Sequence, residues 1–362
     1  MATVGKSFEA IDALAPFSLA EKGDNSGLIV GNKENKVKKA LIALDITNEV
    51  ANEAAGIGAE LIISHHPVIY NPLYSLSDEN PANILAKNGI SAICAHTNLD
   101  MAPGGVSDAL AEALGFEGKK VIEVIHRMPF KQVCVFCPEE YAEKVSEAMF
   151  LAGGGQQGNY SHCAFFSKGV GQFMPNEKAN PFIGENGKLE KTQEVRIEML
   201  VPPSRLKSVI SAMKDAHPYE EPAFCVQDNL AFVEKYGFGK LCTSETEFSA
   251  NSLASHIKER LGCKVVRYTD SGKTIKNIAV CSGAGGSLIR YAAEKGADAL
   301  ICGDIKHDQL ISARNLGISV FDAGHFHTEA VILPKLKEVL ANAFPETEFE
   351  IAAQSIDPAL YE

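Results

Sequence analysis

The chain has 362 residues, a length that suits two or three domains better than one hydrophobic core. Hydrophobic residues at 46% and charged residues at 22% are typical of a soluble globular protein. The net charge of −12, without a stripe of Lys and Arg, argues against a general nucleic-acid-binding surface, because phosphates are held by clustered cations.

The N-terminal segment lacks the apolar region of a signal peptide, and no stretch reaches the roughly 18 to 20 apolar residues of a membrane span. We therefore expect a cytoplasmic protein with no membrane partner. Most of the nine cysteines stand in apolar, strand-like runs, which is typical of reduced, buried thiols. Cys134 and Cys137 form a C-x-x-C pair, for which core packing is favoured over a redox or zinc role because no second pair accompanies it.

The N-terminal third alternates strand-like and helix-like segments. Strands are expected at 38–47, 59–66 and 90–96, with helices at 48–58 and 79–89 between them. This β-α-β-α-β order is typical of a parallel sheet covered by helices.

The middle of the chain has a different order. Helical segments at 139–154 and 202–216 each follow one strand and precede another, which predicts a β-α-β-β-α-β ferredoxin-like unit. We expect this α+β domain at 128–230, inserted into an outer domain formed by 1–127 and 231–362.

The C-terminal third returns to the first pattern. Strands are expected at 273–283, 297–304 and 318–324, and helices at 287–296, 307–317 and 328–344. The two ends of the chain are therefore predicted to form one layered α/β/α domain with a mostly parallel sheet.

Potential ligands follow nearly every expected strand of the outer domain. They are Asp45, His65 and His66, His96 and Asp100, Ser282, Asp304 and His307, and Asp322, His325, His327 and Glu329. Any one of them alone is more simply a turn or cap residue. Ligands of open parallel sheets bind outside the carboxyl ends of the strands, so three histidine-and-carboxylate clusters at equivalent ends favour a metal site.

Two further patterns bear on this site. If a helix opens near His325, then His325 and Glu329 share one face of its first turn. Histidines combined with carboxylates suit zinc, iron, manganese or nickel better than calcium. The segment CSGAGGS at 281–287 is either an anion-binding nest or a tight strand-to-helix turn.

The segments ISHHP, AHTNLD and DAGHFHTE, in this order with a large insertion before the third, resemble the Nif-three-like dinuclear metal centre proteins, often labelled GTP cyclohydrolase 1 type 2 homologues. DNSGLIVG at 24–31 and ALDIT at 43–47 extend the resemblance. It implies two divalent transition metal ions, a bridging carboxylate, and one histidine of the adjacent pair for each ion. The ligands that it implies are His65, His66, Asp100, His325 and Glu329, with Glu329 as the bridge. His96 and Asp45, and with them His307 and His327, would support the ligands, face the substrate or shuttle protons.

The inserted segment resembles the PII-like or CutA-like fold of longer family members, in GNYSHCAFFSKGVGQFMP and AHPYEEPAF. Such members form toroidal hexamers, so the resemblance implies a homo-hexamer. It also implies a metal-dependent hydrolase that acts on a nucleotide or phosphoester-type small molecule. The alternative is a metal-binding regulatory or scaffolding hexamer whose PII-like insert senses a metabolite. Five side chains for two ions leave open coordination positions, which favours the enzyme because structural sites are usually closed.

Overall fold

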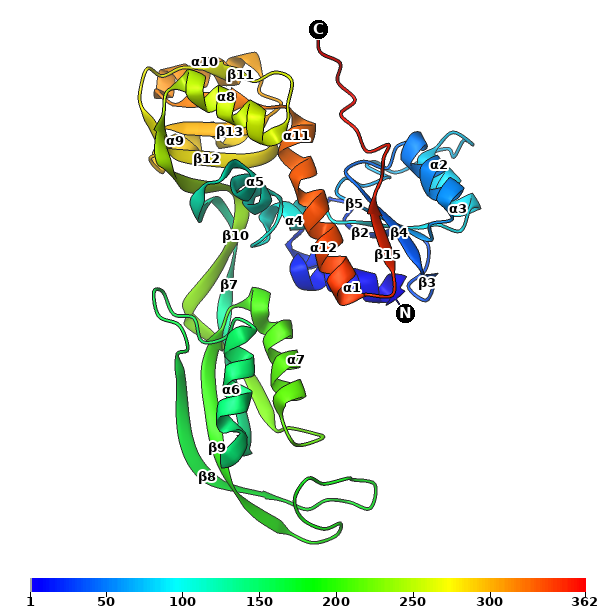
Figure 1. The fold of residues 1–362 in the computed structure, drawn as a ribbon, viewed down its shortest axis with the longest axis vertical. Coiled ribbons are helices and arrows are strands. Elements are labelled where there is room, and N and C mark those ends of the chain that lie inside the picture. Colours follow the sequence, from blue (N-terminus) through cyan, green and yellow to red (C-terminus); the bar gives the residue numbers. More distant parts are fainter. Residues whose placement is uncertain (1) are drawn as a thin grey trace. The chain divides into compact units, whose positions relative to one another are not determined.

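The computed structural model describes residues 2–362 and has an α/β fold (Figure 1). The chain divides into two compact units. Unit 1 comprises Met1–His126 and Tyr236–Glu362, and unit 2 comprises Arg127–Lys235. Within residues 2–362, no helix combines the length and the apolar character needed to cross a membrane.

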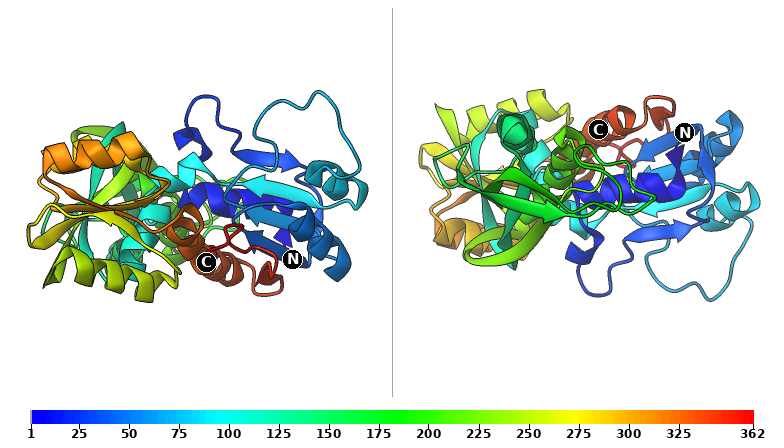
Figure 2. Two further views of the ribbon diagram at one scale, coloured as in Figure 1. Left: turned by 90° about the horizontal axis from the view of Figure 1, so that it is seen from above. Right: turned by 90° about the horizontal axis from the view of Figure 1, so that it is seen from below.

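Unit 1 contains a five-stranded sheet in the order β15-β4-β5-β6-β2. Its strands are β2 (Gly27–Val30), β4 (Lys39–Ala43), β5 (Leu61–Ser64), β6 (Ser91–Cys94) and β15 (Glu348–Ile351). All neighbouring pairs are parallel except β6 and β2. Helices α2 (Asn48–Ile57) and α3 (Pro81–Lys87) cover one face, and α1 (Val4–Leu14) and α12 (Leu333–Ala343) lie on the other (Figures 1 and 2). A short ladder of β1 (Ala2–Thr3) and β3 (Lys36–Val37) stands apart.

The expected β-α-β-α-β order of the N-terminal third is confirmed. Every residue of β5 and β6 is buried, as expected for parallel strands between two layers of helices. Helix α2 begins after Thr47, whose side chain accepts a hydrogen bond from Val50 N, and it ends at Gly58 in the left-handed conformation.

The second sheet has the strand order β11-β14-β13-β12-β10-β7-β9-β8. Unit 1 holds β11 (Arg267–Thr269), β12 (Ile275–Ala284), β13 (Ala299–Gly303) and β14 (Ser319–Asp322), with parts of two long strands, β7 (Glu117–Pro138) and β10 (Phe224–Phe248). Strands β12, β13 and β14 are parallel to one another. Helices α5 (Val106–Leu114) and α8 (Ala250–Leu261) pack on one face, and α9 (Ile289–Glu294) and α10 (His307–Leu316) on the other.

Two expectations for unit 1 need correction. The two ends of the chain build two sheets rather than one. Strands β4, β5 and β6 lie in the five-stranded sheet with β15, whereas β12, β13 and β14 lie in the second sheet, where β12 pairs antiparallel with β10. The helix expected at 328–344 is broken into α11 (His325–Glu329), a 3-10 turn at Ala330–Ile332 and α12. Pro334 explains the break, because it has no N–H to continue a helix but fits the first turn of a new one.

Unit 2 has the predicted β-α-β-β-α-β element order. Between β7 and β10 lie α6 (Ala142–Leu151), β8 (Ala164–Phe173), β9 (Glu190–Val201) and α7 (Leu206–Ala216). Strand β9 pairs antiparallel with both β7 and β8. The two helices cover one face of this sheet through a core that includes Val135, Ile197 and Met213.

All nine cysteines are free thiols in the described chain. Cys137 belongs to the helix-covered core of unit 2, whereas Cys134 accepts a hydrogen bond from Arg196 Nε at 3.2 Å. Residues three apart in a strand point to opposite faces. The C-x-x-C pattern therefore does not bring its two thiols together.

Candidate metal centre

The side chains that follow the parallel strands of unit 1 come together in one cluster. His65 and His66 directly follow β5, and His325 opens α11 after β14. His66 Nε2 and His325 Nε2 lie 3.4 Å apart, so groups from both sheets meet. The carboxyl ends of these strands thus form a single site, as the topology of open sheets favours.

Glu329 lies buried at the centre of the cluster. Its Oε2 lies 3.1 Å from His66 Nε2 and 3.0 Å from His325 Nε2. Its Oε1 lies 3.8 Å from His65 Nε2, and that nitrogen is 3.6 Å from Asp100 Oδ1. The two oxygens of one carboxylate therefore face two separate groups of donors.

His96 adds a third imidazole to the two of the adjacent pair. Its ring centroid lies 5.3 Å from that of His65 and 5.4 Å from that of His66, and the three rings offer nitrogens close enough to share an ion. His96 Nε2 also lies 3.3 Å from the Tyr70 hydroxyl. Both side chains line a cavity beside the cluster, so His96 lies between the other donors and this cavity.

An acceptor outside the cluster holds Nδ1 of each of the four histidines. The partners are Ala95 O for His65, Asp45 Oδ1 for His66, Asp24 Oδ1 for His96 and Asp304 Oδ2 for His325, at 2.8, 2.8, 2.8 and 2.7 Å. When Nδ1 donates to these oxygens, Nε2 of the neutral ring keeps its lone pair. This arrangement orients imidazoles for metal ions.

The donor set fits a bound cation. His65 Nε2 and Glu329 Oε2 are buried without a hydrogen-bond partner, although Nε2 of His66 and of His325 lie 3.1 and 3.0 Å from this oxygen. Buried polar atoms are normally satisfied, and a metal ion between these groups would satisfy both. Gly283, in the turn at 281–287, leaves space for the carboxylate, since a Cβ there would lie 2.1 Å from Glu329 Oε1.

Charge coupling within the cluster is strong. Burial lowers the pKa of His66, but Asp45 and Glu329 outweigh it and raise this pKa to about 10. The contact with Glu329 is the largest effect on His325 and raises its pKa to about 9. Although burial raises the pKa of Glu329, the neighbouring imidazoles hold it well below its usual range. Metal ions would compete with protons for these nitrogens.

The five side chains predicted as ligands all lie in this cluster. Of the two residues predicted to support the ligands, Asp45 accepts a hydrogen bond from His66 Nδ1, and His96 packs against the ring of His65. His307 and His327 do not join them among the described residues: His307 is exposed, and His327 Nε2 lies 3.3 Å from Asp357 Oδ2.

Sequence reasoning assigned no role to Asp24 or Tyr70. Asp24 accepts hydrogen bonds from the Thr97 hydroxyl and from Ser26, in addition to its contact with His96. Burial raises the pKa of Asp24, but these contacts outweigh it and hold the pKa below the usual range. The sequence signal was the DNSG segment, which contains Asp24, but its partners His96 and Thr97 lie more than 70 residues away in the sequence.

Two cavities flank the cluster within unit 1. One, of about 420 Å³, is lined by Tyr70, His96, Asp100 and Glu329, among others. The second, of about 620 Å³, is lined by Asp45, His66, Asp304 and Arg267. His325 lines both cavities, so the cluster is accessible to small molecules from two directions.

This chain is similar to known proteins over nearly its whole length. A family model described as Duf34/NIF3 (NGG1p interacting factor 3) matches residues 2–358. A Bacillus subtilis protein named GTP cyclohydrolase 1 type 2 homolog is 38% identical over 323 residues, covering 88% of this chain and 87% of its own. A homologue of the same name from Halalkalibacterium halodurans is 35% identical and covers 94% of each chain. The crystal structure of a Bacillus cereus protein related to NIF3 is similar over 99% of each chain, with 36% identity and a TM-score of 0.76.

Proposed function

Because this chain belongs to the Duf34/NIF3 family, we propose that its histidine and carboxylate cluster holds two divalent transition metal ions and that the protein is a metal-dependent hydrolase. The observation that carries the proposal is the position of Glu329, whose two oxygens face different donors. A bridging carboxylate in a dinuclear site has this arrangement.

The donors divide into two sets that share Glu329. His65 and Asp100 would hold one ion, and His66 and His325 the other. Nitrogen and carboxylate oxygen together suit zinc, iron, manganese or nickel. Three side chains for each ion leave coordination positions for substrate and water, as in catalytic rather than structural sites.

Two adjacent ions would supply a Lewis acid for a substrate oxygen and a water of lowered pKa. His96 is the residue we assign to proton transfer, because its Nε2 faces the cavity while Asp24 holds its Nδ1. Asp45, the other residue predicted for this role, is engaged with His66 Nδ1 and therefore orients that ligand. Tyr70 can hydrogen-bond to His96 or to a substrate in the same cavity.

We propose a nucleotide or a phosphoester-type small molecule as the substrate. The relatives named GTP cyclohydrolase 1 type 2 homolog support the nucleotide, and hydrolysis of a phosphoester would need the same groups. Cavities of about 420 and 620 Å³ have the size of small-molecule sites.

Other features implied by the family resemblance stay predictions: a toroidal homo-hexamer, a PII-like identity for the insert, and a cytoplasmic location. The β-α-β-β-α-β order of unit 2 supports the second of them. A regulatory metal-binding hexamer is the rival function. It predicts full metal content without turnover.

The test combines metal analysis with turnover. Full-length protein purified without an affinity tag should contain about two transition metal ions per chain. It should hydrolyse GTP or a model phosphoester, lose this activity on chelation and regain it with added metal. Glu329→Gln should remove both metal and activity. Glu338→Gln, an exposed acid on α12, is the matched control and should change neither. A metal-free, fully stable wild-type protein would overturn the dinuclear centre, and metal-loaded protein without turnover would favour the rival.

A further inference from the structure

Unit 2 contains a cavity of about 250 Å³ that the proposed hydrolase does not use. Its walls come from three segments that are distant in sequence: the end of β8 with the loop that follows, strand β9, and the segment after α7. All residues that line it belong to unit 2. The cavity therefore belongs to the insert alone.

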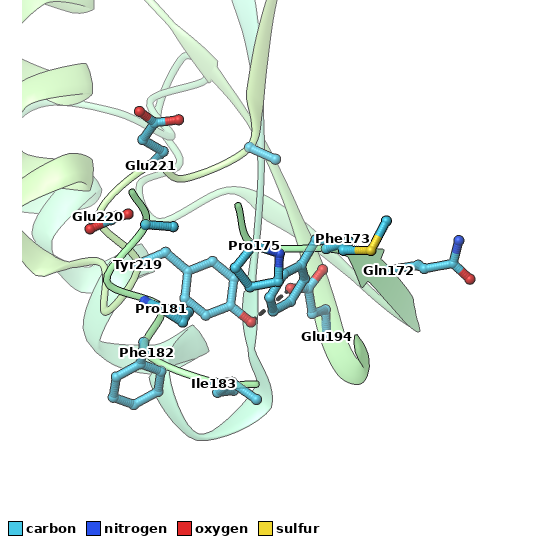
Figure 3. A pocket seen from close by; sticks show the side chains of 13 residues that line it. Gln172, Phe173, Pro175, Pro181, Phe182, Ile183, Glu194, Tyr219, Glu220 and Glu221 are labelled. Atoms are coloured by element: carbon cyan, nitrogen blue, oxygen red, sulfur yellow. Dashed lines mark hydrogen bonds between the residues drawn. The ribbon is translucent and has the colours of Figure 1, made fainter. Parts of the chain in front are cut away.

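Three aromatic rings form the centre of the cavity wall. Tyr219 stands between Phe182 on one side and Phe173 with Pro175 on the other (Figure 3). The ring centroid of Tyr219 lies 6.0 Å from that of Phe173 and 6.2 Å from that of Phe182, with interplanar angles of 58° and 47°. These three inclined rings line the same cavity.

The charge of the cavity is of one sign. Glu194, Glu220 and Glu221 line it, and no Lys, Arg or His does so among the described residues. None of the three carboxylates takes part in an ion pair that the structure shows within residues 2–362. The cavity thus combines aromatic faces with uncompensated negative charge, and it disfavours anionic ligands such as nucleotides.

Glu194 is the carboxylate closest to the rings. Its Oε1 accepts a hydrogen bond from the Tyr219 hydroxyl at 2.9 Å (Figure 3). Gly171 gives the other oxygen room, because a Cβ at this position would lie 2.2 Å from Glu194 Oε2. Glu220 instead accepts from Asn180 N with both of its oxygens. Glu194 therefore has one oxygen fixed against the aromatic wall and one without a fixed donor.

We propose that this cavity binds a small organic cation, an ammonium or guanidinium group carried on a few carbon atoms. Cations are attracted to the faces of aromatic rings, and the Glu194 carboxylate supplies the opposite charge. Apolar walls from Pro181 and Ile183 suit the carbon atoms of such a molecule. A hard divalent metal ion needs several oxygen ligands close together. Among the described residues, the carboxylates of this cavity do not form such a group.

The proposal is independent of the metal centre. In residues 2–362, every group of side chains that could hold a metal ion lies in unit 1. The cation proposal goes beyond the proposed hydrolase, because it assigns a separate class of ligand to unit 2. Failure of the metal centre would leave the following test unchanged.

The test measures binding to the full-length protein by saturation-transfer NMR and titration. The probes are choline, agmatine, and 3,3-dimethylbutan-1-ol, which has the shape of choline without its charge. Both cations should bind, and the neutral alcohol should bind about tenfold more weakly than choline. Pivalate, an anion of similar shape, should not bind.

Variants place the binding in this cavity. Glu194→Gln keeps an acceptor for the Tyr219 hydroxyl but removes the charge, and it should weaken cation binding about fivefold or more. Tyr219→Leu should have at least the same effect, whereas Tyr219→Phe keeps the ring and should retain binding. Glu147→Gln, an exposed acid on α6 outside the cavity, is the matched control and should change nothing.

Several results would overturn the proposal. These are no cation binding at millimolar concentration, equal binding of choline and its neutral analogue, and binding unaffected by Glu194→Gln together with Tyr219→Leu. Binding of a blocked arginine peptide without binding of agmatine would also overturn it, because the site would then recognise a protein partner.

Discussion

Glu329 in unit 1 and Glu194 in unit 2 are both carboxylates that depend on a neighbouring glycine for space. A Cβ at Gly283 would lie 2.1 Å from Glu329 Oε1, and one at Gly171 would lie 2.2 Å from Glu194 Oε2. What differs is the surroundings. Glu329 is buried among three imidazoles, whereas Glu194 is only partly buried beside one phenol.

This difference predicts two kinds of ligand. Both oxygens of Glu329 face fixed nitrogen donors, and the backbone at Gly283 is left-handed with φ of 57°, so the geometry is set before a ligand arrives. Such preorganisation favours tightly held metal ions. Glu194 has one oxygen fixed by Tyr219 and one free to adjust, which favours a weakly held, exchanging cation.

The largest expected effect is the loss of one metal ion per chain. It would show whether the two oxygens of Glu329 bind different ions. His65→Ala and His66→Ala should each reduce the metal content from about two ions per chain to about one. The ion that remains should differ between the two variants, because His65 faces Oε1 and His66 faces Oε2. Elemental analysis with spectroscopy of the cobalt-substituted protein measures this. Loss of the same ion in both variants would contradict the division of the histidines.

The position of these histidines was predictable from the sequence, and the reason is topological. Each of these histidines follows a strand or opens the helix after one, so the meeting of parallel carboxyl ends was sufficient to group them. The spacing of His325 and Glu329 placed both on one helical turn, and α11 has this turn.

Other features depend on contacts that the sequence does not encode locally. The last strand, β15, pairs with β4, so strands from both ends of the chain share the five-stranded sheet of unit 1. Asp24 reaches His96 from a loop, with no periodic pattern to indicate it. The insert cavity is built by side chains from three separate segments, and aromatic residues such as Tyr219 are more often core residues than ligand contacts when only the sequence is known.

The second effect in size concerns the residues that orient the proposed metal ligands. Asp304 accepts from His325 Nδ1 and has a positive φ of 53°, a conformation that Gly and Asn tolerate. Asp304→Gly should weaken metal affinity about 10- to 100-fold, because the imidazole loses its orienting partner. Asp304→Asn keeps an acceptor oxygen and should lose less. Competition with a chromogenic chelator measures the affinities, and equal losses in both variants would show that only the charge matters.

The third effect compares the two glycines directly. Gly283→Ala should weaken metal affinity about tenfold, since the methyl group displaces Glu329 Oε1, and the left-handed backbone adds a cost of about 1 to 2 kcal/mol. Gly171→Ala should leave metal content and thermal stability nearly unchanged, because the end of the Glu194 side chain can move aside. Metal titration and thermal unfolding of both variants give the answer. A large loss of stability in Gly171→Ala would show that Glu194 is as rigidly held as Glu329.

The smallest effect is a pH dependence of unit 2, centred on a histidine beside the insert cavity. His217 Nε2–H donates to Phe136 O at 2.9 Å, and His217 Nδ1 accepts from Tyr219 N at 3.0 Å, so both ring nitrogens are engaged in the neutral form. Burial lowers the pKa of His217 below its usual 6.5. The unfolded chain therefore binds more protons than the fold in the interval between the two pKa values, so stability rises with pH there.

The stabilisation from neutral His217 is thus fully present above about pH 6.5 and is lost as the pH falls through the lowered pKa of the folded protein. Hydrogen exchange of the Tyr219 amide should accelerate over this interval beyond the intrinsic pH trend. His217→Asn should remove most of the pH dependence and cost about 1 kcal/mol at neutral pH, from the loss of buried hydrogen bonds. Metal content of unit 1 should not follow this change. An unaltered pH profile in His217→Asn would mean that another group governs the wall of the cavity and that Tyr219 is held independently of His217.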